Sequence, residues 1–294
     1  MDAFRCLLFR LLRKSNVRRL LLRFLYDVLC SMTNELERIS AGDVDYGRHG
    51  LGYAQMRRTD PRIAAWVHRA LGNARTILNV GAGAGSYEPQ DRYVLAIEPS
   101  EAMRAQRPKH LVPTIHGIAE QLPLDDQSVD ASMALMTVHQ WRDLDNGLRE
   151  LRRVTRGPIV VLTFDGDALD RYWLADYAPE LISIERRRYP AIETIAKGLG
   201  GVTDVQVIPV PIDCVDGFTE AHYARPESFL DSAIRRSQSA WSFVPETDQL
   251  RIVQTLSDDL KSGTWDRKYV EWRTKPYFEG SLRLIVRNVP GRSG

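Results

Sequence analysis

The stretch Thr76-Ile-Leu-Asn-Val-Gly81-Ala-Gly83-Ala-Gly85-Ser-Tyr87 joins a short apolar run to three closely spaced glycines. Glycines at such a turn let the backbone bend sharply and approach a ligand. The next apolar run ends at Glu98, seventeen residues after Gly81. At about this spacing, roughly 20 residues, an acidic side chain can accept hydrogen bonds from ribose hydroxyls. Together, the glycines and Glu98 predict a nucleoside site.

The connection after the glycines limits the class of nucleoside ligand that the site can bind. A dinucleotide fingerprint has the spacing GxGxxG, whereas this chain has GxGxG, with Ser86 where the third glycine would stand. Only the segment from Ser86 to Arg92 separates Gly85 from the next apolar run, and Pro89 lies inside it. This leaves little room for a helix whose N-terminus binds a pyrophosphate. The pattern therefore favours a ligand without phosphates.

Apolar runs of strand length alternate with amphipathic stretches along most of the chain. Such alternation is typical of an α/β protein with a mostly parallel sheet. Pro209 and Pro211 suit an edge strand, because proline cannot donate a hydrogen bond to a neighbouring strand. We expect strands at 76–80, 93–97, 112–116, 129–136, 159–164, 203–212 and 282–287, and helices at 62–71, 100–107 and 143–155.

Residues 217–278, between the last two expected strands, have a helical pattern. Pro226 and Pro245 stand near expected helix starts, and Gly263 stands near an expected stop. Ten of the 25 aromatic residues lie in this segment, so we expect it to form a small core of its own and to cap the main domain. The sequence thus predicts an N-terminal extension at 1–34, a main domain at 35–216 and 279–294, and a helical cap at 217–278.

Residues 1–34 carry seven basic and two acidic side chains, with apolar residues at helical spacing. We expect a basic amphipathic helix, because arginines interrupt every apolar run before it reaches the ~20 residues that a bilayer requires. Such a helix could contact an anionic membrane surface through residues 1–31. We favour another interpretation, in which Met32 is the normal start and the preceding segment is an extension of the reading frame or a loosely attached tail.

The composition, 44% hydrophobic and 27% charged over 294 residues, is typical of a globular chain and excludes the collagen and disordered classes. Cys6, Cys30 and Cys214 form no CxxC pair, which argues against a disulfide framework and against a cysteine-based zinc site. This cysteine usage fits a reducing, cytoplasmic setting. A net charge of +2 gives no electrostatic case for nucleic acid as a partner, and the scattered histidines predict no metal site.

Three segments resemble motifs of one enzyme family, namely LNVGAGAGS at 78–86, LAIEPSEAM at 95–103 and AEQLPLDDQSVD at 119–130. They look like the first motif, the second motif and the approach to the fourth strand in class I S-adenosylmethionine-dependent methyltransferases. The small-molecule group that includes the ubiquinone and menaquinone biosynthesis methyltransferases is the most similar. The resemblance covers about residues 46–164 and the final strand. It implies a Rossmann-like, doubly wound, seven-stranded α/β fold and S-adenosyl-L-methionine as the cofactor.

The resemblance also implies which residues bind that cofactor. The glycines would line its methionine and ribose, Glu98 would hold the ribose hydroxyls, and two residues would meet the adenine, one of them through its backbone. Two positions depart from the family pattern, because Asn79 and Ile118 stand where the family often has acids. With two residues of an N-terminal flap, the implied cofactor-binding set is Gly81, Gly83, Gly85, Glu98, Met103, Ala119, Tyr53 and Arg57.

Candidates for the chemistry follow the fourth and fifth strands, because the crevice of an open α/β sheet lies beyond the carboxyl ends of its strands. His139 is our candidate catalytic residue, as a general base near neutral pH. The alternative is an orienting or non-catalytic histidine, since methyl transfer from a sulfonium needs mainly good alignment. Trp141, Trp173 and Tyr177 are candidates for substrate binding, with core packing as the alternative.

These observations predict a methyltransferase that acts on a small, partly apolar organic acceptor. Two other functions stay open at this point. The first is a non-catalytic protein that binds S-adenosylmethionine or S-adenosylhomocysteine, which would agree with Asn79, Ile118 and the lack of an obvious base. The second is a nicotinamide-dependent oxidoreductase, which Ser86 and the short connection after Gly85 disfavour.

Overall fold

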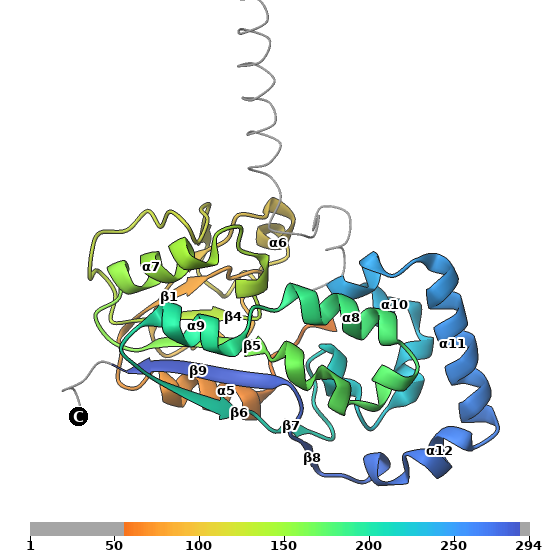
Figure 1. Ribbon diagram of the computed structural model, residues 1–294. Coiled ribbons are helices and arrows are strands. Elements are labelled where there is room, and N and C mark those ends of the chain that lie inside the picture. The colour runs from red at the N-terminus through yellow and green to blue at the C-terminus, as the bar shows by residue number, and fades with distance from the viewer. Residues whose placement is uncertain (1–55, 289–294) are drawn as a thin grey trace, which may run out of the picture. The chain divides into compact units, whose positions relative to one another are not determined.

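A computed structural model describes residues 56–288. Its centre is a seven-stranded sheet with the strand order β3–β2–β1–β4–β5–β9–β6 (Figure 1). Strands β1 to β5 pair in parallel, whereas β9 runs antiparallel to both of its neighbours. The strands are β1 (Thr76–Val80), β2 (Tyr93–Ile97), β3 (Thr114–Ile115), β4 (Ala131–Leu135), β5 (Ile159–Phe164), β6 (Val202–Val207) and β9 (Leu282–Asn288). The expected mostly parallel, seven-stranded fold is confirmed.

Strand β1 is the point where the strand order reverses. Its neighbours are β2 on one side and β4 on the other, so the connections after β1 and after β3 lead in opposite directions. In open α/β sheets, ligands bind beyond the carboxyl ends of the strands at such a reversal. The glycine-rich turn follows β1 directly, which puts it at this position.

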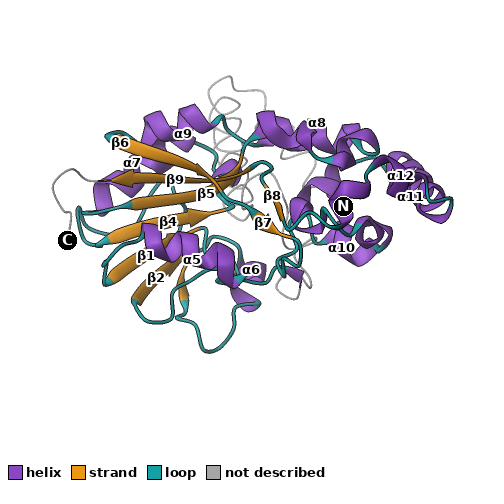
Figure 2. Ribbon diagram, turned by 90° about the horizontal axis from the view of Figure 1, so that it is seen from below, coloured by secondary structure: helices purple, strands orange, loops and turns teal. Residues whose placement is uncertain are grey.

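Helices cover both faces of the sheet (Figure 2). Helix α5 (Pro61–Ala70) packs on one face, whereas α7 (Leu144–Val154) and α9 (Ile192–Leu199) pack on the other. Alternate residues of each strand point to opposite faces, so Ile77 joins the α5 side and Leu78 joins the α7 side. Helix α5 starts where the Asp60 carboxylate accepts a hydrogen bond from the Arg62 amide.

A second group of helices lies beyond the carboxyl ends of the parallel strands (Figure 2). It combines the segment after β5 with the segment after β7 (Val210–Pro211). Strand β7 itself pairs with β8 (Tyr277–Phe278) in a separate small sheet. We call this group of helices the helical layer. Its members are η2 (Gly166–Arg171), η3 (Trp173–Asp176), α8 (Pro179–Arg188), η4 (Thr219–His222), η5 (Pro226–Leu230), α10 (Ser232–Arg236), η6 (Ser239–Phe243), α11 (Glu246–Lys261), α12 (Thr264–Lys268) and η7 (Val270–Arg273).

The helical layer does not have a separate core, and this part of the expectation was wrong. Its aromatic side chains, among them Trp241 and Trp265, belong to one continuous cluster with α5 and the adjacent face of the sheet. The reason is the second contribution to this layer, because buried residues of η3 and α8, such as Trp173 and Leu181, belong to the same cluster. Sequence periodicity gave no signal for α8.

Two expected strands also differ from the structure. The expected strand 203–212 divides into β6 and β7, which belong to different sheets, and Pro209 lies between them. Proline has no amide hydrogen and interrupts the pairing there. The expected strand 112–116 shortens to the two residues of β3, and α6 (Glu101–Ala105) is shorter than the expected helix 100–107. The basic N-terminal extension lies outside the described residues. No helix within residues 56–288 is long and apolar enough to cross a membrane.

Candidate active site

A pocket lies beyond the ends of β1, β2 and β4, and we call it the glycine pocket. It encloses about 570 Å³, including space open to solvent. Residues of the glycine turn form one wall, and residues that follow β4 form another. The lining residues are Arg57, Asn79, Gly81, Ala82, Gly83, Ala84, Ser86, Tyr87, Glu98, Met103, Leu135, Met136, Thr137 and Gln140.

The three glycines of the turn all have positive φ angles, of 67°, 50° and 93° for Gly81, Gly83 and Gly85. Side chains rarely adopt this conformation, so the sequence needs glycine there. A Cβ atom on Gly81 would also collide with Thr137, and one on Gly85 would collide with Leu111. At Gly81 and Gly83 the turn therefore presents bare backbone to the pocket, whereas Gly85 does not line it.

Glu98 lines the pocket beside this turn. Its carboxylate accepts hydrogen bonds of 2.8 Å from the amides of Gly83 and Ser100, one on each oxygen. The side chain is 5% exposed, and its burial raises the pKa of the carboxyl, although the two amides oppose this shift. Each oxygen keeps a second lone pair, so Glu98 can still accept two hydroxyl donors. Met103 lines the same pocket close to Gly83.

Asn79 stands where the family often has an acid, and the structure shows a carboxylate beside it. The Asn79 amide donates a 2.8 Å hydrogen bond to Glu88, and Glu88 forms a buried ion pair with Arg107. A negative charge is thus present next to position 79, but it comes from nine residues further along the chain. Spacing along the sequence gave no signal for Glu88.

Arg57 also lines the glycine pocket. Its guanidinium forms a 2.8 Å ion pair with the buried Asp216 and donates a 2.7 Å hydrogen bond to the Met136 sulfur. The Tyr87 hydroxyl donates a 2.6 Å hydrogen bond to the same Asp216 carboxylate. Burial and the Asp216 charge raise the pKa of Tyr87 well above its usual value, so the phenol stays protonated. This network joins the glycine turn to the segment that follows β7.

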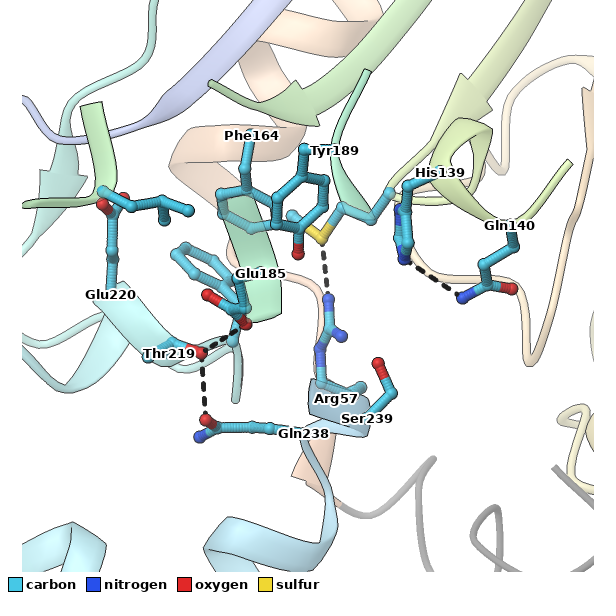
Figure 3. Close-up of a pocket in the computed structure, with 13 residues that line it drawn as sticks. Arg57, His139, Gln140, Phe164, Glu185, Tyr189, Thr219, Glu220, Gln238 and Ser239 are labelled. Atoms are coloured by element: carbon cyan, nitrogen blue, oxygen red, sulfur yellow. Dashed lines mark hydrogen bonds between the residues drawn. The ribbon is translucent and has the colours of Figure 1, made fainter. Parts of the chain in front are cut away.

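A second pocket adjoins the first (Figure 3). We call it the carboxyl pocket, and it encloses about 520 Å³, again including open space. Arg57, Met136 and Gln140 line both pockets, so the two share a wall. The other lining residues come from the ends of β4 and β5 and from the helical layer. They are His139, Phe164, Leu169, Glu185, Tyr189, Phe218, Thr219, Glu220, Gln238 and Ser239.

Two buried carboxyl groups give this pocket its name. Glu185 comes from α8 and is 6% exposed, and Glu220 comes from η4 and is 1% exposed. Burial raises the pKa of each to about 7, and the neighbouring Glu185 charge adds to the shift of Glu220. Both oxygens of Glu220 accept from the single amide of Ser281, at 2.9 and 3.0 Å.

His139 lies where the sequence placed it, in the turn η1 (Val138–Gln140) after β4, and it lines the carboxyl pocket. Its ring packs edge-on against Tyr189 with 4.8 Å between ring centroids, and its Nε2 lies 3.4 Å from the Gln140 amide nitrogen. The backbone just before it is unusual, because Met136 has a φ of 54°. Such conformations are uncommon outside glycine and gather at functional sites.

Four other expected site residues lie elsewhere among the described residues. The side chain of Ala119 is buried in the core on the α7 side, and Trp141 packs on Gly147 of α7. Trp173 and Tyr177 are 3% and 5% exposed and belong to the aromatic core of the helical layer. None of the four lines either pocket. Their packing role follows from this burial, and Tyr53 lies outside the described residues.

The sequence could have indicated some of the residues that it missed. Thr137 and Gln140 line the glycine pocket and directly follow β4, where strand-end residues are expected to meet ligands. Glu185 and Glu220 had no such signal, because each belongs to a helical segment of unremarkable composition. Within residues 56–288, no group of three or more histidine, cysteine or acidic side chains is arranged to hold a metal ion.

The strand order, the antiparallel β9 and the glycine pocket at the reversal of strand order define a Rossmann-like nucleoside-binding enzyme of the methyltransferase class. The family described as a methyltransferase domain matches residues 78–158. A crystal structure from Anabaena variabilis, described as that of a methyltransferase from an antibiotic biosynthesis pathway, shares 30% sequence identity. The match covers 80% of this chain and all of that chain, with a TM-score of 0.76. The chain therefore belongs to the class I S-adenosylmethionine-dependent methyltransferases.

Curated relatives agree with this family. Uncharacterised methyltransferases of Mycobacterium tuberculosis and Mycobacterium bovis are 34% identical over 104 residues, which is 33% of this chain. The match spans 41% of the length of those relatives. The family membership disfavours the nicotinamide-dependent alternative.

Proposed function

We propose that this chain transfers the methyl group of S-adenosylmethionine to a small, partly apolar acceptor. The observation that carries the proposal is the pair of adjoining pockets that share Arg57, Met136 and Gln140. A methyl donor in one pocket and an acceptor in the other would meet at this shared wall. Methyl transfer depends mainly on such an in-line approach of the acceptor atom to the methyl group.

The residues of the glycine pocket suit the donor. The turn of Gly81, Gly83 and Gly85 offers bare backbone, and the Glu98 carboxylate has spare lone pairs for two ribose hydroxyls. Met103 supplies an apolar surface for adenine, and Arg57 would close the pocket beside the shared wall. We keep Ala119 and Tyr53 as proposed contacts, Ala119 through its backbone.

When bound, S-adenosylmethionine supplies a methyl group already activated on a positively charged sulfur. The protein then has to orient the acceptor and exclude water. We propose that His139, which lines the carboxyl pocket, removes a proton from the acceptor. The apolar side chains of Met136, Phe164 and Phe218 would hold the acceptor body.

The helical layer would act as the cap of this enzyme. We propose that the main domain is formed by residues 35–216 and 279–294 and that residues 217–278 close the acceptor side. Glu185, from α8 of the main-domain segment, contributes to the same side.

Calorimetry with S-adenosylhomocysteine tests the donor site. Replacing Glu98 by glutamine removes a charged acceptor, and such hydrogen bonds contribute about 1.5 to 3 kcal/mol. We therefore expect Glu98→Gln to weaken binding by roughly 10- to 100-fold. Glu101→Gln, at the exposed start of α6, is the matched control and should bind normally. A wild-type protein that binds no S-adenosylhomocysteine would overturn the proposed function.

The same preparations test the role of His139. Incubation of His139→Ala with methyl-labelled S-adenosylmethionine and a small-metabolite extract should give much less labelled product than the wild type. Its affinity for S-adenosylhomocysteine should stay unchanged. Equal labelling by both proteins would remove His139 from the mechanism, and no labelling by the wild type would favour the non-catalytic binding protein.

A further inference from the structure

The carboxyl pocket has more acidic than basic character among its described lining residues. Glu185 and Glu220 both line it, whereas Arg57 is the only arginine or lysine among the described residues that do so. The charge of Arg57 is already balanced, because Asp216 accepts from its guanidinium at 2.8 Å. The lining within residues 56–288 therefore supplies no spare positive charge.

Nearby arginines outside the lining do not bond to the two carboxyl groups. Arg283 lies near Glu220, but its guanidinium binds Asp165 at 2.9 Å and the carbonyls of Gly280 and Leu282. Arg188 acts on Glu185 through its charge, and its guanidinium donates to the Ser239 hydroxyl. Within the part of the chain that the structure describes, neither buried carboxyl group has a direct ion pair.

Glu185 also has fewer hydrogen-bond donors than a buried, ionised carboxylate needs. Its Oε1 lies 3.4 Å from the Thr219 hydroxyl, which lies closer, at 3.0 Å, to Oε1 of Gln238 (Figure 3). One hydroxyl hydrogen cannot serve both acceptors, and the shorter contact favours Gln238. An ionised Glu185 would then lack a hydrogen-bond donor of its own.

Gln238 supplies an independent sign of a missing ligand. It is 5% exposed and lines the same pocket. The Trp241 indole donates to its Oε1 at 3.2 Å, which fixes the orientation of the amide. Its Nε2 then has no hydrogen-bond partner among residues 56–288, although it is buried. Leaving such a donor unpaired is unfavourable, so a ligand atom that accepts a hydrogen bond, separate from the ligand's own donors, is expected beside it.

We infer that the acceptor of the proposed methyl transfer carries a basic nitrogen, which binds as an ammonium group between Glu185 and Glu220 in the carboxyl pocket. An ammonium group supplies three donors and the positive charge that two buried carboxylates need. A neutral hydroxyl would supply one donor and leave the charge uncompensated. The aromatic side chains Phe164, Tyr189 and Phe218 would surround the apolar body of the same molecule. This inference rests on the proposed function.

The two proposals can be tested separately with matched amines and alcohols. The probes are benzylamine and 2-phenylethylamine, with benzyl alcohol and 2-phenylethanol as neutral counterparts. Binding of each probe to the full chain is measured by ligand-observed NMR with S-adenosylhomocysteine present. We expect each amine to bind at least tenfold more tightly than its alcohol. Failure to bind S-adenosylhomocysteine would contradict the proposed function, whereas the comparison of probes concerns only this inference.

Two isosteric variants locate the nitrogen. Glu185→Gln and Glu220→Gln should each weaken amine binding tenfold or more and leave the affinity for S-adenosylhomocysteine unchanged, which also shows that they are folded. Glu193→Gln, on the exposed face of α9, is the control and should bind amines normally. The inference is overturned if no amine binds to the protein with S-adenosylhomocysteine bound, if the alcohols bind as tightly, or if both variants keep the wild-type affinity.

Discussion

At the scale of single residues, Asn79 shows how a departure from a family pattern can be compensated locally. The usual acid is absent, yet Glu88 brings its carboxylate within 2.8 Å of the Asn79 amide. Both side chains are buried, and Arg107 pairs with Glu88. Asparagine is favoured here because its amide can donate to Glu88, whereas an aspartate would place two carboxylates side by side.

The variant Asn79→Asp should therefore be less stable than the wild type. Two adjacent buried carboxylates repel each other and leave one without its donor, which we expect to cost about 2 kcal/mol of unfolding free energy. Adding Glu88→Gln restores a donor and should recover most of this loss. Urea unfolding of both single variants and the double variant measures the coupling. Additive effects of the two changes would contradict this account.

The sequence was informative for residues whose role depends on the backbone. Gly81, Gly83 and Glu98 line the glycine pocket, because their positions follow from one strand, one turn and the next strand, whereas Gly85 lies outside its lining. Glu88 was missed because its side chain reaches position 79 only through the tight course of the turn, which includes Tyr87 at a φ of 65°. Local spacing does not reveal such a contact.

At the scale of elements, the turn η3 holds the helical layer together. Trp173 packs against Tyr177, Phe229 and Trp265, and its indole donates a 2.7 Å hydrogen bond to the Tyr223 carbonyl. The sequence presented Trp173 as a candidate for substrate binding. Its contacts instead join the segment after β5 to the segment 217–278.

Replacing Trp173 by phenylalanine should destabilise the protein without removing its aromatic surface. The Tyr223 carbonyl would lose its buried donor, and part of the packing would be lost, for a total of roughly 1 to 3 kcal/mol. Thermal unfolding should detect a lower Tm. Trp66→Phe, at a half-buried position on α5, is the control and should change Tm less. Equal Tm values for the two variants would contradict a structural role for Trp173.

Elements were predictable where their residues alternate or repeat regularly. Strands β1, β2 and β5 have the expected bounds, and α5 and α7 begin and end within one residue of them. Helix α8 was not predicted because Glu185 interrupts its buried face, on which Leu181 and Ile182 also lie. A buried acid looks like a solvent-exposed residue in a sequence pattern.

At the scale of the whole molecule, the two buried carboxyl groups make folding depend on pH. The pKa values of Glu185 and Glu220 rise from 4.5 to about 7 on folding. Between these pH values the unfolded chain has lost both protons and the folded chain still holds them. The folded state then binds more protons, so stability falls as pH rises through about 7.

Because these two groups ionise in this range, the wild type without ligands should have a lower Tm at pH 8 than at pH 5.5. One pKa unit corresponds to about 1.4 kcal/mol, so the rise from 4.5 to about 7 accounts for on the order of 3 kcal/mol for each carboxyl group, of which roughly 2 kcal/mol is lost between pH 5.5 and 8. Glu185→Gln and Glu220→Gln should each reduce this fall in Tm, whereas Glu193→Gln should not. Parallel Tm curves for all four proteins between pH 5.5 and 8 would show that the carboxyl groups ionise normally.

The sequence by itself determined the sheet, the glycine turn and the acid opposite it, because these depend on hydrophobic period and on spacing along short segments. It therefore indicated the methyltransferase class and the proposed donor site. Only the tertiary structure decided the proposed acceptor side, since Glu185, Glu220 and Gln238 meet there from three separate segments of the helical layer. Their chemistry arises from burial and from the shortage of partners, and both are properties of packing.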